Sequence, residues 1–310
     1  MLRYRVASLL VPFFLLAPAL HGELGKFRWS YVAGIVALFA SYVVATCVND
    51  IFDVEIDRVN APDRPLASGR TTRRTLVITA LVAAVIALVL APSPALMALS
   101  LLFNVLYSAP PVRICSRPHL AAPSLAIAYV ALPYGLGLAA ASVAPSSFDA
   151  RTVAALVVLF TGRMLLKDFR DRRGDAMFGK RTFLLVHGKR ATVVAVLLCV
   201  VAGDALLISV LPSAVLIAVV QTFFAAIAFE LYRLEQGEDE LAAIARGARM
   251  GNAVILTWLG FSVLPAAEAN VLAVALGALY WLVYLLPAPA ATTTAASSRE
   301  TAAAESARAS

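Results

Sequence analysis

The sequence predicts an all-α integral membrane protein, and three observations support this fold class. Of the 310 residues, 61% are hydrophobic and 15% are charged, with a mean hydropathy of +0.84, which is far more apolar than an ordinary soluble domain. Apolar stretches close to membrane-spanning length recur along nearly the whole chain. Basic residues gather in alternate connections between these stretches, as in the cytoplasmic loops of multispanning proteins.

Ten apolar stretches are candidate membrane helices. Prolines blur the edges of several short ones, so nine spans are as defensible as ten. In chain order the stretches cover residues 6–20, 30–48, 76–90, 95–106, 120–141, 152–166, 191–211, 213–232, 252–266 and 271–286. The first stretch could instead be a cleaved signal peptide, because a basic start precedes its apolar run. Residues 287–310 are rich in Ala, Thr and Ser and are expected to form a disordered tail.

The basic residues test these spans independently of hydropathy. With ten spans and a cytoplasmic N-terminus, 23 of the 26 lysines and arginines fall on the cytoplasmic side, and only Lys26, Arg28 and Arg151 fall outside it. The net charge of +7 is therefore spread over loops that face anionic lipid. This distribution argues against a nucleic-acid partner and predicts a multi-pass protein of the cell membrane.

Two acidic motifs follow the second and the sixth apolar stretches. Their aspartates are Asp50, Asp53 and Asp57 in the first motif and Asp168, Asp171 and Asp175 in the second. Each aspartate of the second motif lies 118 residues after its counterpart in the first, so both motifs have the same spacing of three and four residues. The repeat predicts one domain over residues 1–286 with two related halves, about 1–145 and 146–286, and both motifs on the cytoplasmic side.

The aspartates of each motif would share one face if the preceding helix continues, because positions i, i+3 and i+7 lie close together around a helix. Three like charges at the end of a membrane helix repel each other and are costly to desolvate. Mg²⁺ binds carboxylates and completes its shell with water and phosphate oxygens. The two motifs therefore predict two or more Mg²⁺ ions that clamp a diphosphate. The alternative is a pair of solvated loops whose carboxylates pair with nearby arginines.

Cationic side chains near the motifs are candidates for binding the same diphosphate, because guanidinium and ammonium groups bind phosphate oxygens. The candidate substrate-binding residues are Arg64, Arg70, Tyr107, Arg113, Lys167, Lys180 and Arg181. Arg64 and Lys180 come first, because each follows its acidic motif closely. Each cation alone could equally be a charge that sets topology, and Tyr107 could be an interfacial aromatic residue.

The remaining candidate ligands are scattered along the chain. The three cysteines at positions 47, 115 and 199 have no paired spacing, so they indicate neither a disulfide framework nor a zinc site. The histidines at positions 21, 119 and 187 are equally far apart. We expect these histidines to be interfacial or packing residues.

Four stretches together resemble the UbiA superfamily of intramembrane prenyltransferases, in particular its 4-hydroxybenzoate polyprenyltransferase-like members. They are Asn-Asp-x-x-Asp-x-x-x-Asp at 49–57, Arg-Pro-Leu-x-Ser-Gly at 64–69, Tyr-Ser-x-Pro-Pro-x-Arg at 107–113, and Asp-x-x-Asp-x-x-x-Asp at 168–175 followed by Gly-Lys-Arg-Thr at 179–182. The resemblance covers about residues 1–265. Any one of these motifs would be weak evidence, whereas the four together are highly specific.

The resemblance implies a ring of nine transmembrane helices around a central cavity, with both acidic motifs at its cytoplasmic mouth and an opening to lipid. It implies Mg²⁺-dependent loss of diphosphate from a prenyl diphosphate donor and alkylation of an acceptor. Asn49 would orient an acidic ligand or a phosphate. The chain departs from the family in lacking an Arg-Pro pair in its first helix and in carrying Arg170, Arg172 and Arg173 within the second motif.

These departures leave the acceptor open. The leading hypothesis is transfer of a polyprenyl group to an aromatic or quinone-precursor acceptor. A second hypothesis is transfer to a nonaromatic, lipid-type acceptor, or cyclisation of the prenyl diphosphate itself. A third is an ion or solute transporter, because intramembrane carboxylates also mark ion paths. The position of the acidic residues at helix ends rather than in the middle of spans argues against the transporter.

Overall fold

A computed structural model describes residues 9–210 together with 226–233, 243–244 and 278. Most of the predicted span at 213–232, the spans at 252–266 and 271–286, and the tail at 287–310 lie outside the described residues. The whole set of nine or ten spans and the division into two halves therefore stay predictions.

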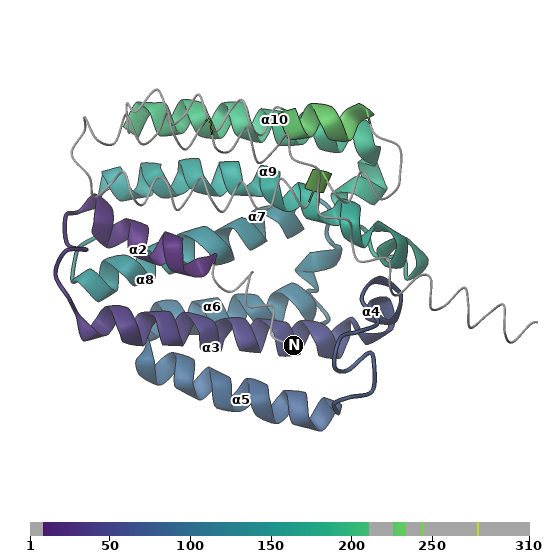
Figure 1. Cartoon of the computed structure of the whole chain (residues 1–310), viewed down its shortest axis with the longest axis horizontal. Coiled ribbons are helices and arrows are strands. Elements are labelled where there is room, and N and C mark those ends of the chain that lie inside the picture. Colours follow the sequence, from purple (N-terminus) through teal and green to yellow (C-terminus); the bar gives the residue numbers. More distant parts are fainter. Residues whose placement is uncertain (1–8, 211–225, 234–242, 245–277, 279–310) are drawn as a thin grey trace, which may run out of the picture.

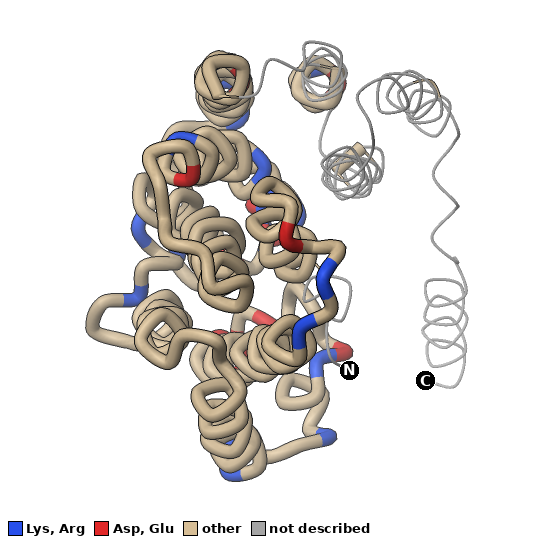
Figure 2. The backbone as a smooth tube through the Cα atoms, turned by 90° about the vertical axis from the view of Figure 1, so that its left-hand side faces the viewer, with Lys and Arg blue, Asp and Glu red and all other residues tan. Residues whose placement is uncertain are grey.

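The described residues form helices and short connections, with no strand among them. In chain order the elements are α2 (Leu10–Leu20), α3 (Trp29–Phe52), α4 (Val54–Asn60), α5 (Arg73–Leu90), α6 (Pro94–Ser108), the 3₁₀ turn η1 (Ile114–Ser116), α7 (Ala121–Ala126), the π-helical turn η2 (Ile127–Ala131), α8 (Leu132–Ala141), α9 (Ser147–Met177) and α10 (Phe183–Val210). Figure 1 shows the long helices side by side, with α4 at the same end of the bundle as the end of α9. Figure 2 shows them from the opposite end, so that the described helices are seen nearly along their axes.

The first seven predicted spans each coincide with a helix or a continuous helical run. Four runs are long and apolar enough to cross a membrane, namely Trp29–Phe52, Arg73–Leu90, Ala121–Ala141 and Phe183–Val210. Helix α5 has an outward apolar surface that suits contact with lipid. Its Leu81 is 63% exposed and its Val89 is 75% exposed. An outward apolar face of this kind is typical of a helix whose solvent is the bilayer.

Residues 49–60 and 167–177 are helical apart from a break at Asp53, so the acidic motifs do not lie in solvated loops. Helix α9 continues through the second acidic motif and ends near Gly179, whose φ of 65° is the left-handed conformation that commonly closes a helix. The 31 residues of α9 span about 46 Å, against about 30 Å of hydrocarbon. Polar sequence here therefore marks a helix that extends beyond the bilayer rather than a loop.

Close backbone contacts hold the helices together where glycine replaces a side chain. A Cβ atom on Gly137 of α8 would lie 2.0 Å from the carbonyl oxygen of Phe14 in α2. A Cβ atom on Gly203 of α10 would lie 2.5 Å from the Leu159 side chain in α9. Membrane helices approach closely at such small residues, because apolar side chains gain little by leaving lipid.

Asp149 anchors the end of α9 that is far from the acidic motifs. It forms a capping box with Ser146 and accepts hydrogen bonds from the Tyr134 hydroxyl at 2.6 Å and from His21 Nε2 at 2.8 Å. These partners come from α8 and from the residue that follows α2, so one buried carboxylate joins three segments. A fully bonded carboxylate of this kind avoids the cost of burying an unpaired charge.

Asn60, the last residue of α4, joins the two acidic motifs through the backbone of α9. Its Nδ2 donates to the Asp171 carbonyl oxygen at 2.9 Å, and its Oδ1 accepts from the Gly174 amide at 2.7 Å. A Cβ atom on Gly174 would lie 2.5 Å from this Oδ1, so glycine is the residue that leaves room for the amide side chain. The bidentate contact sets the position of α4 against the last turns of α9.

We predict that Gly174→Ala and Asn60→Ala each lower the free energy of unfolding by about 1–3 kcal/mol, because the first displaces the Asn60 side chain and the second removes its hydrogen bonds. In the Asn60→Ala background, Gly174→Ala should not lower the free energy of unfolding further. The Asn60 side chain that would meet the new Cβ atom is then absent, and alanine favours the helix. Thermal unfolding of the purified single and double variants measures this coupling.

Arg58→Ala on the same helix serves as the control for this cycle. Arg58 forms an exposed ion pair with Glu55 at 2.6 Å, so its removal should change stability by less than about 0.5 kcal/mol. Strictly additive effects of the Asn60 and Gly174 substitutions would contradict the proposed contact.

Candidate functional site

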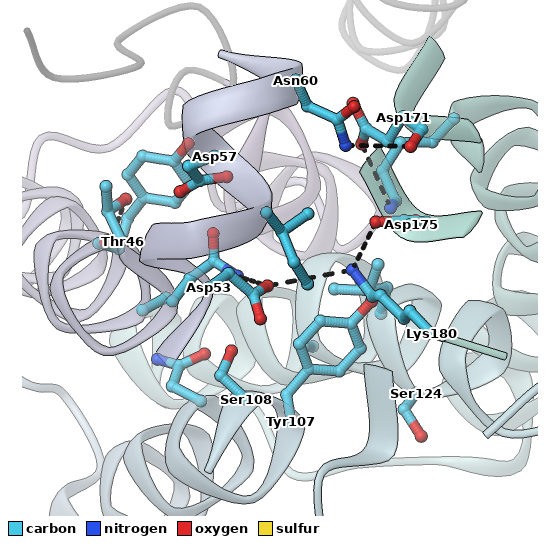
Figure 3. Close-up of a pocket in the computed structure, with 18 of the residues that line it drawn as sticks. Thr46, Asp53, Asp57, Asn60, Tyr107, Ser108, Ser124, Asp171, Asp175 and Lys180 are labelled. Carbon is cyan, nitrogen blue, oxygen red and sulfur yellow. Dashed lines mark hydrogen bonds and ion pairs between the residues drawn. The ribbon is translucent and has the colours of Figure 1, made fainter. Parts of the chain in front are cut away.

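A cavity of about 980 Å³, including its open mouth, lies where α3, α4, α6, η2 and α9 meet. Both acidic motifs contribute to it (Figure 3). Its lining residues are Tyr42, Ala45, Thr46, Asn49, Asp53, Ile56, Asp57, Asn60, Arg64, Phe103, Asn104, Tyr107, Ser108, Ser124, Leu125, Ala128, Tyr129, Lys167, Arg170, Asp171, Asp175 and Lys180. The charged side chains come from the motif-bearing ends of α3, α4 and α9 and the connections that follow them, while the aromatic side chains come from α3, α6 and η2.

The first acidic motif lies across a break between two helices. Helix α3 ends at Phe52, Asp53 has φ −106° and ψ 17°, and α4 begins at Val54. The expectation of one continuous helical face for Asp50, Asp53 and Asp57 was therefore wrong for this motif. All three carboxylates are buried, but only Asp53 and Asp57 line the cavity.

The second acidic motif lies on an unbroken helix, as the spacing predicted. Asp168, Asp171 and Asp175 all belong to α9, and the latter two line the cavity. Asp168 is also buried, and its Oδ1 forms an ion pair with Lys167 Nζ at 3.2 Å. Lys167 also lies 3.8 Å from Asp171, so this lysine neutralises successive turns of the motif.

Arg64 and Arg113 supply positive charge to the first motif. Arg64 donates to Asp57, and its guanidinium lies 3.4 Å from Asp50 Oδ1 and 3.3 Å from Asn49 Oδ1. Asn49 in turn donates to Asp53 Oδ2 at 2.8 Å. The amide thus contacts a motif carboxylate, and the orienting role that the resemblance implied for Asn49 stays a prediction.

Arg113 reaches the motif from the connection between α6 and α7. Its backbone adopts φ 40° and ψ 62°, a left-handed conformation that costs a non-glycine residue roughly 1–2 kcal/mol. Its guanidinium donates to Asp53 Oδ1 at 2.7 Å. Burial lowers the pKa of Arg113, but the hydrogen bond and the charge of Asp53 outweigh this, so its pKa lies above the ordinary value.

Lys180 joins the two motifs, because its Nζ lies 3.3 Å from Asp175 Oδ1 and 3.8 Å from Asp53 Oδ2. Figure 3 shows this ammonium between the two carboxylates, with Tyr107 pointing into the cavity nearby. Burial raises the pKa of Asp175, and the positive charges of Lys180 and Lys167 offset only part of this effect. The Oδ2 atom of Asp175 is buried and accepts no hydrogen bond from the described residues.

The structure does not bring every predicted site residue to the cavity. Arg70 is exposed and donates to the Asp63 carbonyl and to Ser68, within its own connection. Arg181 is also exposed and lies outside the lining, although its neighbour Lys180 is central to the site. A cation next to an acidic motif in sequence thus need not face it in space.

The lining contains residues that the motifs did not indicate. Tyr42, Thr46 and Asn60 follow the helical spacing of Asn49 and Asp53, so extending the motif by one or two turns in each direction could have found them. Their contribution comes from the faces of α3 and α4 that already carry the motif.

Tyr129 belongs to the π-helical turn η2, where the helix presents a residue in an altered direction. Asn104 of α6 donates to the Ser41 carbonyl at 3.2 Å and lies across from α3. No local sequence pattern indicated either residue as part of the site. Each lines the cavity because of how its helix packs against the others.

The chemistry of the donor set suits a hard divalent cation together with a polyanion. In the part of the chain that the structure describes, no three Asp, Glu, His or Cys side chains converge as a ready-made metal site. Motif carboxylates face Arg64, Arg113 and Lys180 instead. The oxygen donors and the buried Oδ2 of Asp175 fit Mg²⁺ ligation, with phosphate oxygens completing the shell.

Comparison with known proteins gives several similar sequences. The first is 2-acylphloroglucinol 4-prenyltransferase of Humulus lupulus, 28% identical over 51% of this chain and 41% of that protein. The bacteriochlorophyll synthase 34 kDa chain of Chloroflexus aurantiacus is 34% identical over 51% of each chain. A digeranylgeranylglyceryl phosphate synthase of Methanoculleus marisnigri is 33% identical over 58% of this chain and 64% of that protein. The matches with the first of these relatives span about half of their length.

Solved structures show the same fold. A UbiA homolog from Archaeoglobus fulgidus bound to DMAPP and Mg²⁺ has a TM-score of 0.65 at 13% identity and covers 92% of this chain and 100% of that chain. A digeranylgeranylglyceryl phosphate synthase has a TM-score of 0.63 at 19% identity and covers 83% of this chain and 93% of that chain. At these identities the likeness establishes the helical membrane fold alone.

The profile of the UbiA prenyltransferase family matches residues 9–252, which include both acidic motifs and every residue that lines the cavity. The match covers well over half of the 310 residues. This chain therefore belongs to the UbiA prenyltransferase family.

Proposed function

We propose that this protein is a Mg²⁺-dependent prenyltransferase that moves a polyprenyl group from a prenyl diphosphate to an aromatic or quinone-precursor acceptor and releases diphosphate. The observation that carries the proposal is the meeting of both acidic motifs with Lys180 and Arg64 at the mouth of one cavity. We place this mouth on the cytoplasmic side, because the basic residues of the predicted topology gather there.

The donor's diphosphate belongs at the charged mouth. Arg64 and Lys180 line the cavity and pair with motif carboxylates, so each can donate to phosphate oxygens in their place, whereas Arg113 lies outside the lining and acts through Asp53. Lys180 is best placed, because it already lies between the two motifs. These cations stabilise the negative charge that grows on the leaving diphosphate as the C1–O bond of the donor breaks.

Asp53, Asp57, Asp171 and Asp175 would hold the metal, because these motif carboxylates line the cavity. Bound Mg²⁺ supplies positive charge to the diphosphate oxygens and so favours their departure. Asp50 and Asp168 would not touch the metal, since they lie outside the lining. They would instead hold Arg64 and Lys167 in place through ion pairs. The UbiA homolog from Archaeoglobus fulgidus, whose structure holds DMAPP and Mg²⁺, supports the use of Mg²⁺ with a prenyl diphosphate.

The prenyl chain belongs in the deeper part of the cavity. Tyr42, Phe103, Tyr107 and Tyr129 present aromatic rings there, beside Leu125 and Ala128. Aromatic faces stabilise a nearby cation, and apolar walls keep water from an allylic carbocation that would otherwise be hydrolysed. The new bond joins the donor's C1 to the acceptor, and the acceptor loses a proton.

The aromatic lining also supports an aromatic acceptor, because flat rings stack favourably against tyrosine and phenylalanine. The name of the Humulus lupulus relative, 2-acylphloroglucinol 4-prenyltransferase, agrees with this choice. A nonaromatic, lipid-type acceptor is the second candidate. It is supported by the likeness to digeranylgeranylglyceryl phosphate synthases in both sequence and fold.

We expect Asp53→Asn and Asp171→Asn each to lower kcat/KM by at least about 100-fold, because each removes an anionic oxygen donor to the metal. Asp63→Asn is the matched control, since Asp63 is an exposed carboxylate outside the cavity lining. Release of diphosphate by purified protein in lipid vesicles, measured with geranylgeranyl diphosphate, an aromatic hydroxy acid as acceptor and Mg²⁺, reports the effect. Unchanged release in both motif variants would contradict the metal assignment.

Lys180→Gln and Arg181→Gln form a second matched pair, because they remove neighbouring charges of which only Lys180 lines the cavity. Losing a charged hydrogen bond to the diphosphate should cost about 1.5–3 kcal/mol, or roughly ten- to hundredfold in kcat/KM. Arg181→Gln should remain within about twofold of the wild type, as expected for an exposed surface charge. Equal losses in the two variants would show that general loop charge, not Lys180, binds the donor.

The acceptor is tested by giving the vesicles labelled geranylgeranyl diphosphate with an aromatic hydroxy acid, with a prenylglycerol phosphate, or with neither. We expect a prenylated product with the aromatic compound, because its ring can stack in the lined cavity. A product formed with the prenylglycerol phosphate but not with the aromatic compound would favour the lipid-type acceptor. A cyclic product formed without any acceptor would replace transfer by cyclisation.

A further inference from the structure

The structure brings together two histidines that lie far apart in the sequence. His119 precedes α7 and His187 lies in the first turns of α10, so 68 residues separate them. Their Nε2 atoms are 3.4 Å apart, and both side chains are exposed. The pair comprises two of the three histidines in the whole chain.

The Nε2 separation fits two ligands of one metal ion better than a direct hydrogen bond. Hydrogen bonds from ring N–H groups usually have donor–acceptor distances of about 2.7–3.2 Å, shorter than the separation found here. Two imidazole nitrogens at about 2.0–2.1 Å from a tetrahedral zinc ion lie about 3.3–3.4 Å apart. The observed 3.4 Å therefore matches the edge of such a coordination sphere.

Phe183 helps to hold the two rings in this arrangement. Its ring centroid lies 5.7 Å from that of His119 in an edge-to-face contact and 4.6 Å from that of His187 in a tilted contact. The two imidazoles themselves are 5.0 Å apart between centroids and inclined by 48°. One phenylalanine thus packs against both imidazoles and fixes their relative placement before any ion binds.

We propose that His119 and His187 form a surface site for a divalent transition-metal ion such as Zn²⁺, with water in the remaining coordination positions. Imidazole suits Zn²⁺, Ni²⁺ and Cu²⁺, whereas Mg²⁺ prefers oxygen ligands. The site is therefore chemically distinct from the carboxylate-rich cavity and does not depend on the proposed prenyl transfer.

An ion at this site would connect two segments that carry cations of the cavity mouth. His119 follows Arg113 in the connection between α6 and α7, and His187 follows Lys180 at the start of α10. Arg113 and Lys180 both contact Asp53. The ion would thus restrain the relative movement of these two segments from outside the cavity.

The test uses full-length protein without a histidine tag, purified in detergent and titrated with Zn²⁺ in a large excess of Mg²⁺. We expect saturable binding of one ion by calorimetry. His119→Gln and His187→Gln should each weaken binding more than about tenfold, because even outer-shell changes cost 10–100-fold in metal affinity. Zn²⁺ should raise the unfolding temperature of the wild type more than that of either variant.

His21→Gln is the control for loss of a histidine, since His21 contacts Asp149 near the other end of α9 and should leave Zn²⁺ affinity unchanged. A second measurement needs no variant: electron paramagnetic resonance of one equivalent of Cu²⁺ should show two imidazole nitrogens. Absence of saturable binding, unchanged affinity in the His119 and His187 variants, or a Cu²⁺ spectrum without two nitrogen ligands would overturn the proposal. None of these measurements uses prenyltransferase activity.

Discussion

The structure depends on charge compensation at one end of a helical bundle that is otherwise apolar. Six motif carboxylates come together there, and desolvating so many like charges would be prohibitive without counter-charges. Arg64, Arg113, Lys167 and Lys180 provide these counter-charges, each within 3.4 Å of at least one motif oxygen. Their pairing offsets the repulsion among the motif carboxylates. It also places the cations that we propose for diphosphate binding beside these carboxylates.

The bilayer explains why such a site can exist next to an apolar cavity. Helices that span hydrocarbon satisfy their own backbone, so polar side chains can be confined to the helix ends and the interior can stay dry. Helix α9 passes from one environment to the other within a single element: bonded Asp149 lies near one end, and the second acidic motif occupies the last turns. One rigid helix therefore fixes the distance between the polar ends of the molecule.

Much of the fold and part of the site could be predicted from the sequence. Apolar stretches identified the helices, and the matching 3-and-4 spacing predicted all six motif aspartates as site residues. Four of them, Asp53, Asp57, Asp171 and Asp175, line the cavity, whereas Asp50 and Asp168 are buried outside the lining. The break at Asp53 was missed, because no glycine or proline occurs within residues 49–57 to indicate it. The contact of Asn60 with α9, the position of Tyr129 and the pairing of His119 with His187 depend on how distant helices pack. A local pattern cannot specify contacts between residues 68 or 111 positions apart.

The break at Asp53 also makes the two acidic motifs structurally different. Two stretches with the same spacing of acidic residues have different backbones here: one bends between α3 and α4, and the other is straight within α9. If the halves arose by duplication, the copies have since become structurally inequivalent while retaining their aspartates. Exchanging the two stretches would then conserve composition and spacing but not function, so sequence symmetry in such a protein is a record of ancestry rather than of working geometry.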